Sequence, residues 1–344
     1  MKPVHISASP VKILWVICIM THSLLSGAQT IYQYKSDYAT ICFFDKNQSQ
    51  YITQLMQKYQ LSLSLHGQIW GELPEQKPFM MLSDWEDDGN GGVVAMPHNS
   101  INIGLAPMNM TYFTAPTNER YDHLYKHEYT HVVMIDKPAT REKKWRNFTG
   151  NKLLPDSDYP ISALWSYFDT PRCYAPRWYH EGIACFLETW MTGGYGRALG
   201  GYDETYFRTR VNDGRELFSV VGLETEGSTS DFQLGVTGYL YGTRFVNYLV
   251  FKYGFAKLVQ FYNRTDDSKA FYPRQFENVY GKGLREVWDE WQSYERVHQE
   301  ENLKKINEYP LTATSKIIDR NIGSASPMIV DKEAGVAYMA MSCP

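Results

Sequence analysis

The feature that most limits how this chain can fold is the run of residues 127–131, which reads His-Glu-Tyr-Thr-His. It lies within residues 119–135, where no Gly or Pro interrupts a helix. Residues i and i+4 share one face of a helix, so the imidazoles of His127 and His131 can point at one metal ion about 2 Å away. Glu128 is offset from that face and can contact a water on the metal without binding the metal itself. The run predicts a metal-binding helix; a solvated helix with two unconnected histidines is the alternative.

A catalytic zinc site needs three protein ligands and an open fourth position. In metzincins the third ligand is a further His, which follows a Gly. This chain has Met134 at the position of that Gly, so the metzincin ligand pattern is excluded. The other solution places a carboxylate on a following helix. Residues 176–184 fit it: their leading Pro suits the first turn of a helix, Glu181 follows one turn later, and Gly182 and Ala184 allow close approach to the first helix. The expected ligands are therefore His127, His131 and Glu181.

The pairing of these two segments resembles the gluzincin zinc metallopeptidases, including their aminopeptidase branch, where a Trp-x-x-Glu-Gly-x-Ala segment supplies the third zinc ligand. Residues 178–184 match that segment. Residues 239–242, Tyr-Leu-Tyr-Gly, are similar to the Tyr-x-Lys-Gly segment of the same branch, whose Tyr stabilises the transition state. The resemblance covers roughly residues 30–300. It implies an α+β, zincin-like domain with an N-terminal mixed sheet, an active-site helix and a C-terminal helical lobe.

The resemblance also implies the chemistry. The three ligands would hold one Zn²⁺ per chain, which polarises the scissile carbonyl and lowers the pKa of its bound water. Glu128 would act as general base and later protonate the leaving amine. Tyr239 would donate a hydrogen bond to the tetrahedral oxyanion, worth about 3 kcal/mol in comparable sites. A packing role is the alternative for Tyr239, and Tyr241 is the reserve candidate. The expected function is a secreted zinc-dependent peptidase acting on a peptide or protein.

Three features depart from the family pattern. Forty-nine residues separate His131 from Glu181, so residues 137–175 must loop out, and we expect them to be irregular. The amine-binding acid of the aminopeptidase branch has no counterpart in residues 92–99, which favours an endopeptidase, or an inactive relative, over an aminopeptidase. Tyr241 replaces the Lys of Tyr-x-Lys-Gly. The alternative function is a catalytically weak or inactive gluzincin-shaped envelope protein that acts by docking, together with a β-propeller. A metal hydrolase of non-peptide substrates is a third.

Other residues near the motifs have candidate roles. A fourth ligand would close the site, so we interpret His123 and His180 as flanking or substrate-facing groups. Asp136 and Glu188 could accept hydrogen bonds from the ligand imidazoles and orient them, and ordinary surface carboxylates are the equal alternative. Residues 93–96 read as a strand that could bind a substrate backbone along its edge, or as an ordinary sheet strand.

The N-terminus reads as an export signal over residues 1–28. Lys2 and Lys12 precede an apolar run at 13–25, and Ser-Gly-Ala at 26–28 is a small-residue cleavage site. A tethered amphipathic N-terminus is the alternative. The run is too short and too polar to span a bilayer, and we expect no permanent membrane span. The expected location is periplasmic or extracellular, in a bacterium.

The chain ends in short segments typical of β-strands. The gluzincin-like domain is expected over residues 29–307, with the Glu- and Lys-rich helix 284–307 as a solvated connector. Residues 308–344 contain two short strands around a turn, which predict a hairpin. A lone hairpin is barely stable in water, so we interpret it as the start of a β-propeller-like module. The similar secreted bacterial proteins have a WD40-like propeller at this place.

Composition sets the remaining limits. The 344 residues include 34 basic and 38 acidic side chains, which excludes a general nucleic-acid binder. The pattern predicts strands within residues 30–46 and 77–106, with a helix at 48–65 between them. Mostly helical sequence follows, and this order is typical of α+β folds. The cysteines that remain after the leader are too few for a disulfide framework or a Cys-based zinc site. A bridge between Cys173 and Cys185 and a packed core position for Cys185 both stay open.

Overall fold

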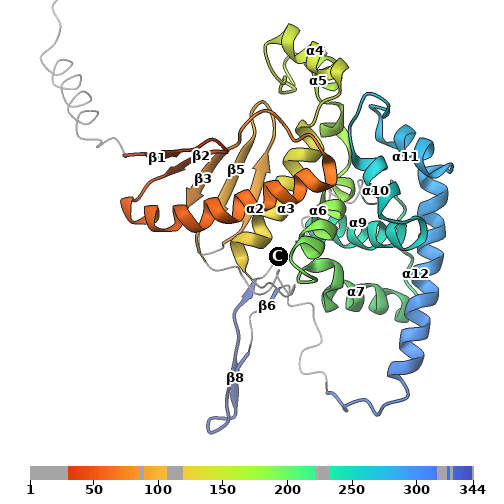
Figure 1. Ribbon diagram of the computed structural model, residues 1–344. Helices are drawn as coiled ribbons and strands as arrows, with labels where there is room; N and C mark the ends of the chain where they lie inside the picture. The colour runs from red at the N-terminus through yellow and green to blue at the C-terminus, as the bar shows by residue number, and fades with distance from the viewer. Residues whose placement is uncertain are drawn as a thin grey trace, which may run out of the picture.

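The computed structural model describes residues 30–85, 89–106, 119–221, 223, 232–315, 324–325 and 328–342. The fold is α+β, as the order of strand-like and helical text predicts. Figure 1 shows the sheet and helix α2 on one side of the molecule, the helices from α6 onward on the other, and α3 between them. The expected export signal at residues 1–28 lies outside the described residues. Within the described part of the chain, no helix is both long and apolar enough to cross a membrane.

The sheet has five strands in the order β1-β2-β3-β5-β4. Its centre is parallel, because β2 pairs with β3 and β3 with β5 in that sense, whereas β1 and β4 join the two edges antiparallel. A parallel pair needs a crossover, and α2 supplies it between β2 and β3. The strands are β1 (Tyr32–Lys35), β2 (Thr40–Phe43), β3 (Phe79–Ser83), β4 (Gly91–Val94) and β5 (Ser100–Gly104).

Helix α2 (Ile52–Trp70) holds the helix that contains residues 127–131 against the sheet. The 3-10 turn η1 (Lys46–Tyr51) precedes α2. Tyr59 packs its ring 5.4 Å from that of Tyr125, and Ser62 Oγ donates to the Tyr125 carbonyl at 3.1 Å. Helix α3 (Arg120–Asp136) is capped by Glu119, whose carboxylate accepts from two backbone N–H groups of the first turn. The prediction of an unbroken helix through residues 127–131 is confirmed.

A second lobe is built from helices that follow α3. Helix α6 (Arg177–Met191) crosses α9 (Phe232–Tyr253) so closely that a Cβ on Gly242 would lie 2.4 Å from the Trp178 carbonyl oxygen. Gly182 of α6 and Gly242 of α9 lie at the crossing, and their lack of side chains sets the distance between the two helices. The lobe is completed by η3 (Arg197–Leu199), α7 (Gly201–Asn212), α10 (Phe255–Tyr262), α11 (Tyr272–Tyr280) and α12 (Leu284–Ile306).

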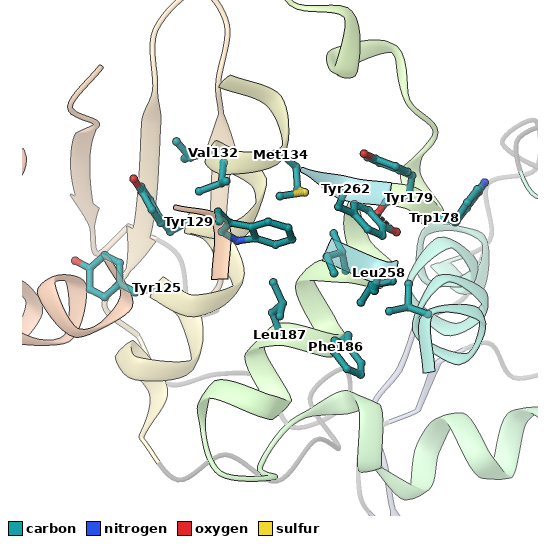
Figure 2. Packing of buried hydrophobic residues seen from close by; sticks show 14 of the residues in the cluster. Tyr125, Tyr129, Val132, Met134, Trp178, Tyr179, Phe186, Leu187, Leu258 and Tyr262 are labelled. Atoms are coloured by element: carbon teal, nitrogen blue, oxygen red, sulfur yellow. Dashed lines mark hydrogen bonds between the residues drawn. The ribbon is translucent and has the colours of Figure 1, made fainter. Parts of the chain in front are cut away.

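One apolar core joins the lobe to α3. Figure 2 shows side chains of α3, α6 and α10 in one buried cluster, which includes Tyr129, Met134, Leu187 and Tyr262. These residues are almost wholly buried. Because α3 and α6 share this core, the two helices that carry the metal motifs are held at a fixed separation.

Two sequence interpretations are wrong in the fold, and the two alternatives left open for Cys185 are decided. Residues 137–175 are not irregular: they contain α4 (Thr140–Thr149), α5 (Ile161–Asp169) and the turn η2 (Pro171–Tyr174). Helix α12 is more than a solvated connector, because Trp288 and Trp291 on one face are fully buried in the core. Cys173 and Cys185 are both free thiols, so of the two open alternatives the packed core position of Cys185 is confirmed and the bridge is absent.

The C-terminal hairpin is confirmed by two antiparallel strands, β7 (Ile329–Asp331) and β8 (Val336–Tyr338). A second short pair is formed by β6 (Ser324–Ala325) and β9 (Met341–Ser342). Every described side chain of β7 and β8 is exposed. The start of a propeller at residues 308–344 and the domain limits 29–307 stay predictions.

Candidate metal centre

Two helices bring the three predicted ligands together. Nε2 of His127 lies 3.1 Å from Nε2 of His131, and each of these atoms lies 3.3 Å from Oε2 of Glu181. Four ligands at about 2 Å from a tetrahedral zinc ion are about 3.3 Å from one another. The triangle of donor atoms therefore has the size that such an ion requires.

The environment of Glu181 fits a cation as well. Its Oε2 is buried and makes no hydrogen bond, although it faces two imidazole nitrogens. Burial alone would raise the pKa of Glu181, but the imidazoles of His131 and His127 outweigh burial and hold that pKa well below its usual range. A buried carboxylate with an unsatisfied oxygen is costly unless a cation binds it. Two imidazole nitrogens and one carboxylate oxygen form a donor set that suits Zn²⁺.

Glu188, one of the two carboxylates considered for orienting the ligands, has that position. Its Oε2 lies 2.5 Å from Nδ1 of His127, which makes Nδ1 the protonated nitrogen and leaves Nε2 to face Glu181. The backbone N–H of Arg197 donates to the other oxygen of Glu188 at 3.3 Å. Burial raises the pKa of Glu188, but His123, Arg197 and His127 outweigh it and lower that pKa to about 2. Glu188 is therefore an anion in a fully buried place.

Asp136, the other candidate for this role, has different partners. Its carboxylate accepts from Asn99 Nδ2 at 2.5 Å and pairs with Arg146 at 2.8 Å and Lys152 at 3.0 Å. Asp136 is the last residue of α3, beyond the face that carries His127 and His131. The orienting interpretation is wrong for Asp136, which instead ties the root of the 137–175 insertion to α3.

Glu128 lies beside the ligand cluster and against the edge strand β4. A Cβ added to Gly91 would be 3.0 Å from Oε1 of Glu128, so the carboxylate uses the space that the glycine leaves. Only 5% of Glu128 is exposed. Burial raises its pKa, and the imidazoles of His127 and His131 offset part of the rise. A buried carboxylate with a raised pKa beside three candidate metal ligands suits the role of a general base.

Tyr239 of α9 borders the cluster, whereas Tyr241 does not. The ring of Tyr239 lies nearly parallel to that of His127 with centroids 6.2 Å apart, and the guanidinium carbons of Arg177 and Arg197 lie 5.2 and 5.1 Å from its centre. Tyr241 is fully buried in the lobe, and its hydroxyl accepts from the backbone N–H of Phe218. The reserve candidate is therefore a core residue.

His123 and His180 are not part of the ligand cluster. His123 Nε2 lies 3.3 Å from Glu188 Oε2, behind the cluster. The ring of His180 lies 6.4 Å from that of His131, and burial lowers its pKa to about 3, so it is a neutral flanking group.

Sequence reasoning missed two residues behind His127. The buried thiol of Cys185 lies within 4.8 Å of ligand atoms of His127 and Glu188, and Nη1 of Arg197 lies 3.4 Å from that sulfur. Cys185 follows Glu181 by four residues, as the candidate Glu188 follows it by seven, so a helical face drawn through Glu181 and Glu188 would have found the thiol. Nothing in the sequence points to Arg197, because η3 brings it back from a separate turn.

The comparisons with known proteins give a weak structural similarity and no matching family. No family model and no curated protein matches the chain. Among solved structures, the chain is similar to the crystal structure of an aminopeptidase N family protein from Idiomarina loihiensis, with a TM-score of 0.34 and 13% sequence identity. The match covers 82% of this chain and 44% of that one, so the chain spans less than half the length of this neighbour. Similarity at this level carries no argument about activity, which has to come from the site.

Proposed function

We propose that this protein is a zinc-dependent peptidase of gluzincin type, with Glu128 as general base. The observation that carries the proposal is the convergence of His127, His131 and Glu181 on one point, with a buried carboxylate at its side. An orphaned oxygen on Glu181 supports a bound cation, and the oriented imidazole of His127 supports a pre-formed site. A structural zinc site would instead be closed by a fourth protein ligand.

The residues of this chain would divide the reaction as follows. Zn²⁺ held by the three ligands supplies Lewis-acid chemistry, which polarises the scissile carbonyl and acidifies a water. Glu128 accepts a proton from the attacking water and delivers it to the amide nitrogen that leaves. The phenol of Tyr239 donates a hydrogen bond to the oxyanion of the tetrahedral intermediate. Glu188 keeps the lone pair of His127 directed at the ligand cluster.

The edge strand β4 suits an extended substrate. It pairs with β5 on one side and is the last strand of the sheet among the described residues, and Glu128 packs against its first residue. A peptide that pairs with the other side of β4 would pass the ligand cluster. Because residues 92–99 contain no acid to bind a free amine, we propose internal cleavage of a peptide or protein rather than removal of its first residue.

Digestion of a diverse peptide library, read by mass spectrometry, tests the proposal. We expect the zinc-loaded protein to cut internal bonds and Glu128→Gln to bind zinc without cutting. Glu300→Gln, on an exposed residue of α12, is the matched control and should cut like the wild type. If zinc-loaded wild-type protein cuts no peptide, the proposal fails and the non-catalytic envelope role becomes the better one. Export, with residues 1–28 as its signal, belongs to the same proposal and is tested by the N-terminus of the protein from its host.

A further inference from the structure

The inference concerns Arg197, which the turn η3 brings back to the metal centre. The backbone of this turn is held between two helices. The N–H of Ala198 donates to the Thr189 hydroxyl of α6 at 3.1 Å, and Nδ2 of Asn247 in α9 donates to the Ala198 carbonyl at 3.1 Å. A Cβ on Gly196 would lie 2.8 Å from Cα of Thr189, so the turn packs directly against α6. The side chain of Arg197 therefore starts from a fixed backbone position.

That side chain contacts two groups of the site at once. The backbone N–H of Arg197 donates to one oxygen of Glu188, and Nη1 lies 3.9 Å from the other. The guanidinium carbon lies 5.1 Å from the centre of the Tyr239 ring. Glu188 is the anion that orients His127, and the ring of Tyr239 lies nearly parallel to that of His127. One guanidinium group thus links the group behind the candidate ligand to the phenol beside it.

Burial distinguishes Arg197 from the other guanidinium group at this ring. Arg177 lies at almost the same distance from the ring centre, 5.2 Å, but its side chain is 54% exposed, whereas that of Arg197 is 15% exposed. A cation over an aromatic face attracts the ring more strongly when water is excluded. Glu188 is fully buried and balances the charge of Arg197, so the guanidinium group can stay in this place. Of the two contacts, that of Arg197 restrains the Tyr239 ring more.

The proposed role of Tyr239 depends on such a restraint. A phenol donates a useful hydrogen bond to an oxyanion only when its oxygen is within about 3 Å of that atom. A misplacement of about 1 Å can lower the rate about 100-fold. The Tyr239 side chain is half-buried, so its own burial fixes the ring only in part. A contact that limits its motion therefore raises the fraction of molecules in which the hydroxyl is correctly placed.

We propose that Arg197 is a positioning residue that holds the ring of Tyr239 for its hydrogen bond to the oxyanion. The guanidinium group lies on the ring, and Glu188 holds the guanidinium group. Arg197 acts through Tyr239 and contacts no substrate itself. The inference rests on the proposed function, because it concerns the residue that would stabilise the tetrahedral intermediate, and it adds a residue that no sequence motif contains.

A double-mutant cycle on the zinc-loaded protein tests whether Arg197 acts through Tyr239. With a peptide that the wild type cuts, Arg197→Met should lower kcat about tenfold and leave KM within about twofold. In a Tyr239→Phe protein the same substitution should change kcat less than about twofold, because there is no hydroxyl left to place. An effect of the Arg197 charge that bypasses Tyr239 would persist in both backgrounds.

Two further variants keep the cycle interpretable. Arg197→Lys retains a positive charge beside Glu188 but loses the planar group on the ring, so it should lower kcat about threefold. If circular dichroism shows that Arg197→Met does not fold, Arg197→Lys takes its place in the cycle. Arg210→Met is the control: it removes a guanidinium group 4.2 Å from the centre of the Phe218 ring in the same lobe, and its kcat should equal that of the wild type.

Nuclear magnetic resonance tests the positioning without any turnover. In protein with ¹³C-labelled tyrosine rings, the signals that Tyr239→Phe removes belong to Tyr239. We expect the order parameter of this ring to fall to about 0.6 or lower in Arg197→Met, as in flexible groups, and to stay high in Arg210→Met. If the wild type cuts no peptide, the proposed function fails and this measurement alone decides the positioning. An unchanged Tyr239 ring in Arg197→Met, or an equal loss of kcat in both backgrounds of the cycle, overturns the inference.

Discussion

Oε2 of Glu188 lies 2.5 Å from Nδ1 of His127, and this contact joins α6 to α3 directly behind the metal-binding face. The two helices thus share both the candidate ligand set and the group that orients it. Replacing Glu188 by Gln keeps its size and removes its charge. We expect Glu188→Gln to lower zinc affinity about 10- to 100-fold, because the imidazole loses its fixed tautomer and part of its basicity. Competition with a chromophoric chelator measures this, and unchanged affinity would contradict the orienting role.

The close crossing of α6 and α9 predicts a stability effect. A Cβ at position 242 would be 2.4 Å from the Trp178 carbonyl oxygen, so Gly242→Ala must push the helices apart. We expect the free energy of unfolding to fall by about 1–3 kcal/mol. Gly67→Ala is the control, because that position lies inside α2 with nothing within 4 Å of the added carbon. There Ala should raise the free energy of unfolding by about 0.5–1 kcal/mol. Denaturant titration decides, and similar effects at both positions would contradict the packing argument.

Substitutions at two neighbouring glycines of β4 distinguish crowding of the Glu128 carboxylate from a general effect on the strand. A Cβ on Gly91 would press on the Glu128 carboxylate at 3.0 Å, whereas a Cβ on Gly92 meets nothing within 4 Å. We expect Gly91→Ala to lower kcat about tenfold with zinc still bound, because a displaced base loses its geometry. Gly92→Ala should keep its kcat. Equal kcat values for the two variants would show that Glu128 does not depend on the space at Gly91.

His66 predicts how stability depends on pH. In its neutral form its Nδ1 accepts from Trp70 Nε1 at 3.1 Å, and Nε2 donates to the Lys126 carbonyl at 3.3 Å. Burial lowers the pKa of His66 to about 3, and a proton on Nδ1 would face another N–H donor. The unfolded chain binds that proton at its ordinary pKa of about 6.5, so stability is full above this pH and falls as the pH drops towards 3.

The variant His66→Gln isolates the contribution of His66 to the pH dependence of stability. A Gln side chain can still accept from Trp70 and donate to the Lys126 carbonyl, but it does not titrate. We expect the free energy of unfolding of the wild type to fall by about 2 kcal/mol more than that of the variant between pH 7 and pH 5. Urea titrations at the two pH values measure the difference. Parallel pH profiles would mean that His66 titrates alike in the folded and unfolded chain.

The convergence of the three candidate ligands was the most predictable part of the site, because local spacing encodes most of it. His127 and His131 stand four residues apart on one helix, and Glu181 stands near the start of another, so only the meeting of the two helices was left to infer. Asp136 and Glu188 look equivalent in the sequence. Which of them reaches an imidazole depends on how α3 and α6 cross, which one sequence does not encode locally.

The misread elements have a similar cause. Trp288 and Trp291 share one face of α12, but the Glu and Lys residues around them obscure that face in the sequence. In the insertion, which was expected to be irregular, Gly150 ends α4 and Pro160 precedes α5, so two short helices fit between the glycine and proline positions. The strands and the order of sheet and helices were predictable from alternation and composition alone.

Metal content measured by mass spectrometry on protein dialysed against zinc-free buffer tests the central claim most directly. We expect one zinc per chain in the wild type and in Glu128→Gln, and less than about a tenth of that in Glu181→Ala, because two imidazoles alone bind too weakly to survive dialysis. Wild-type protein without zinc, or a Glu181→Ala protein that keeps it, would contradict a metal centre formed by His127, His131 and Glu181.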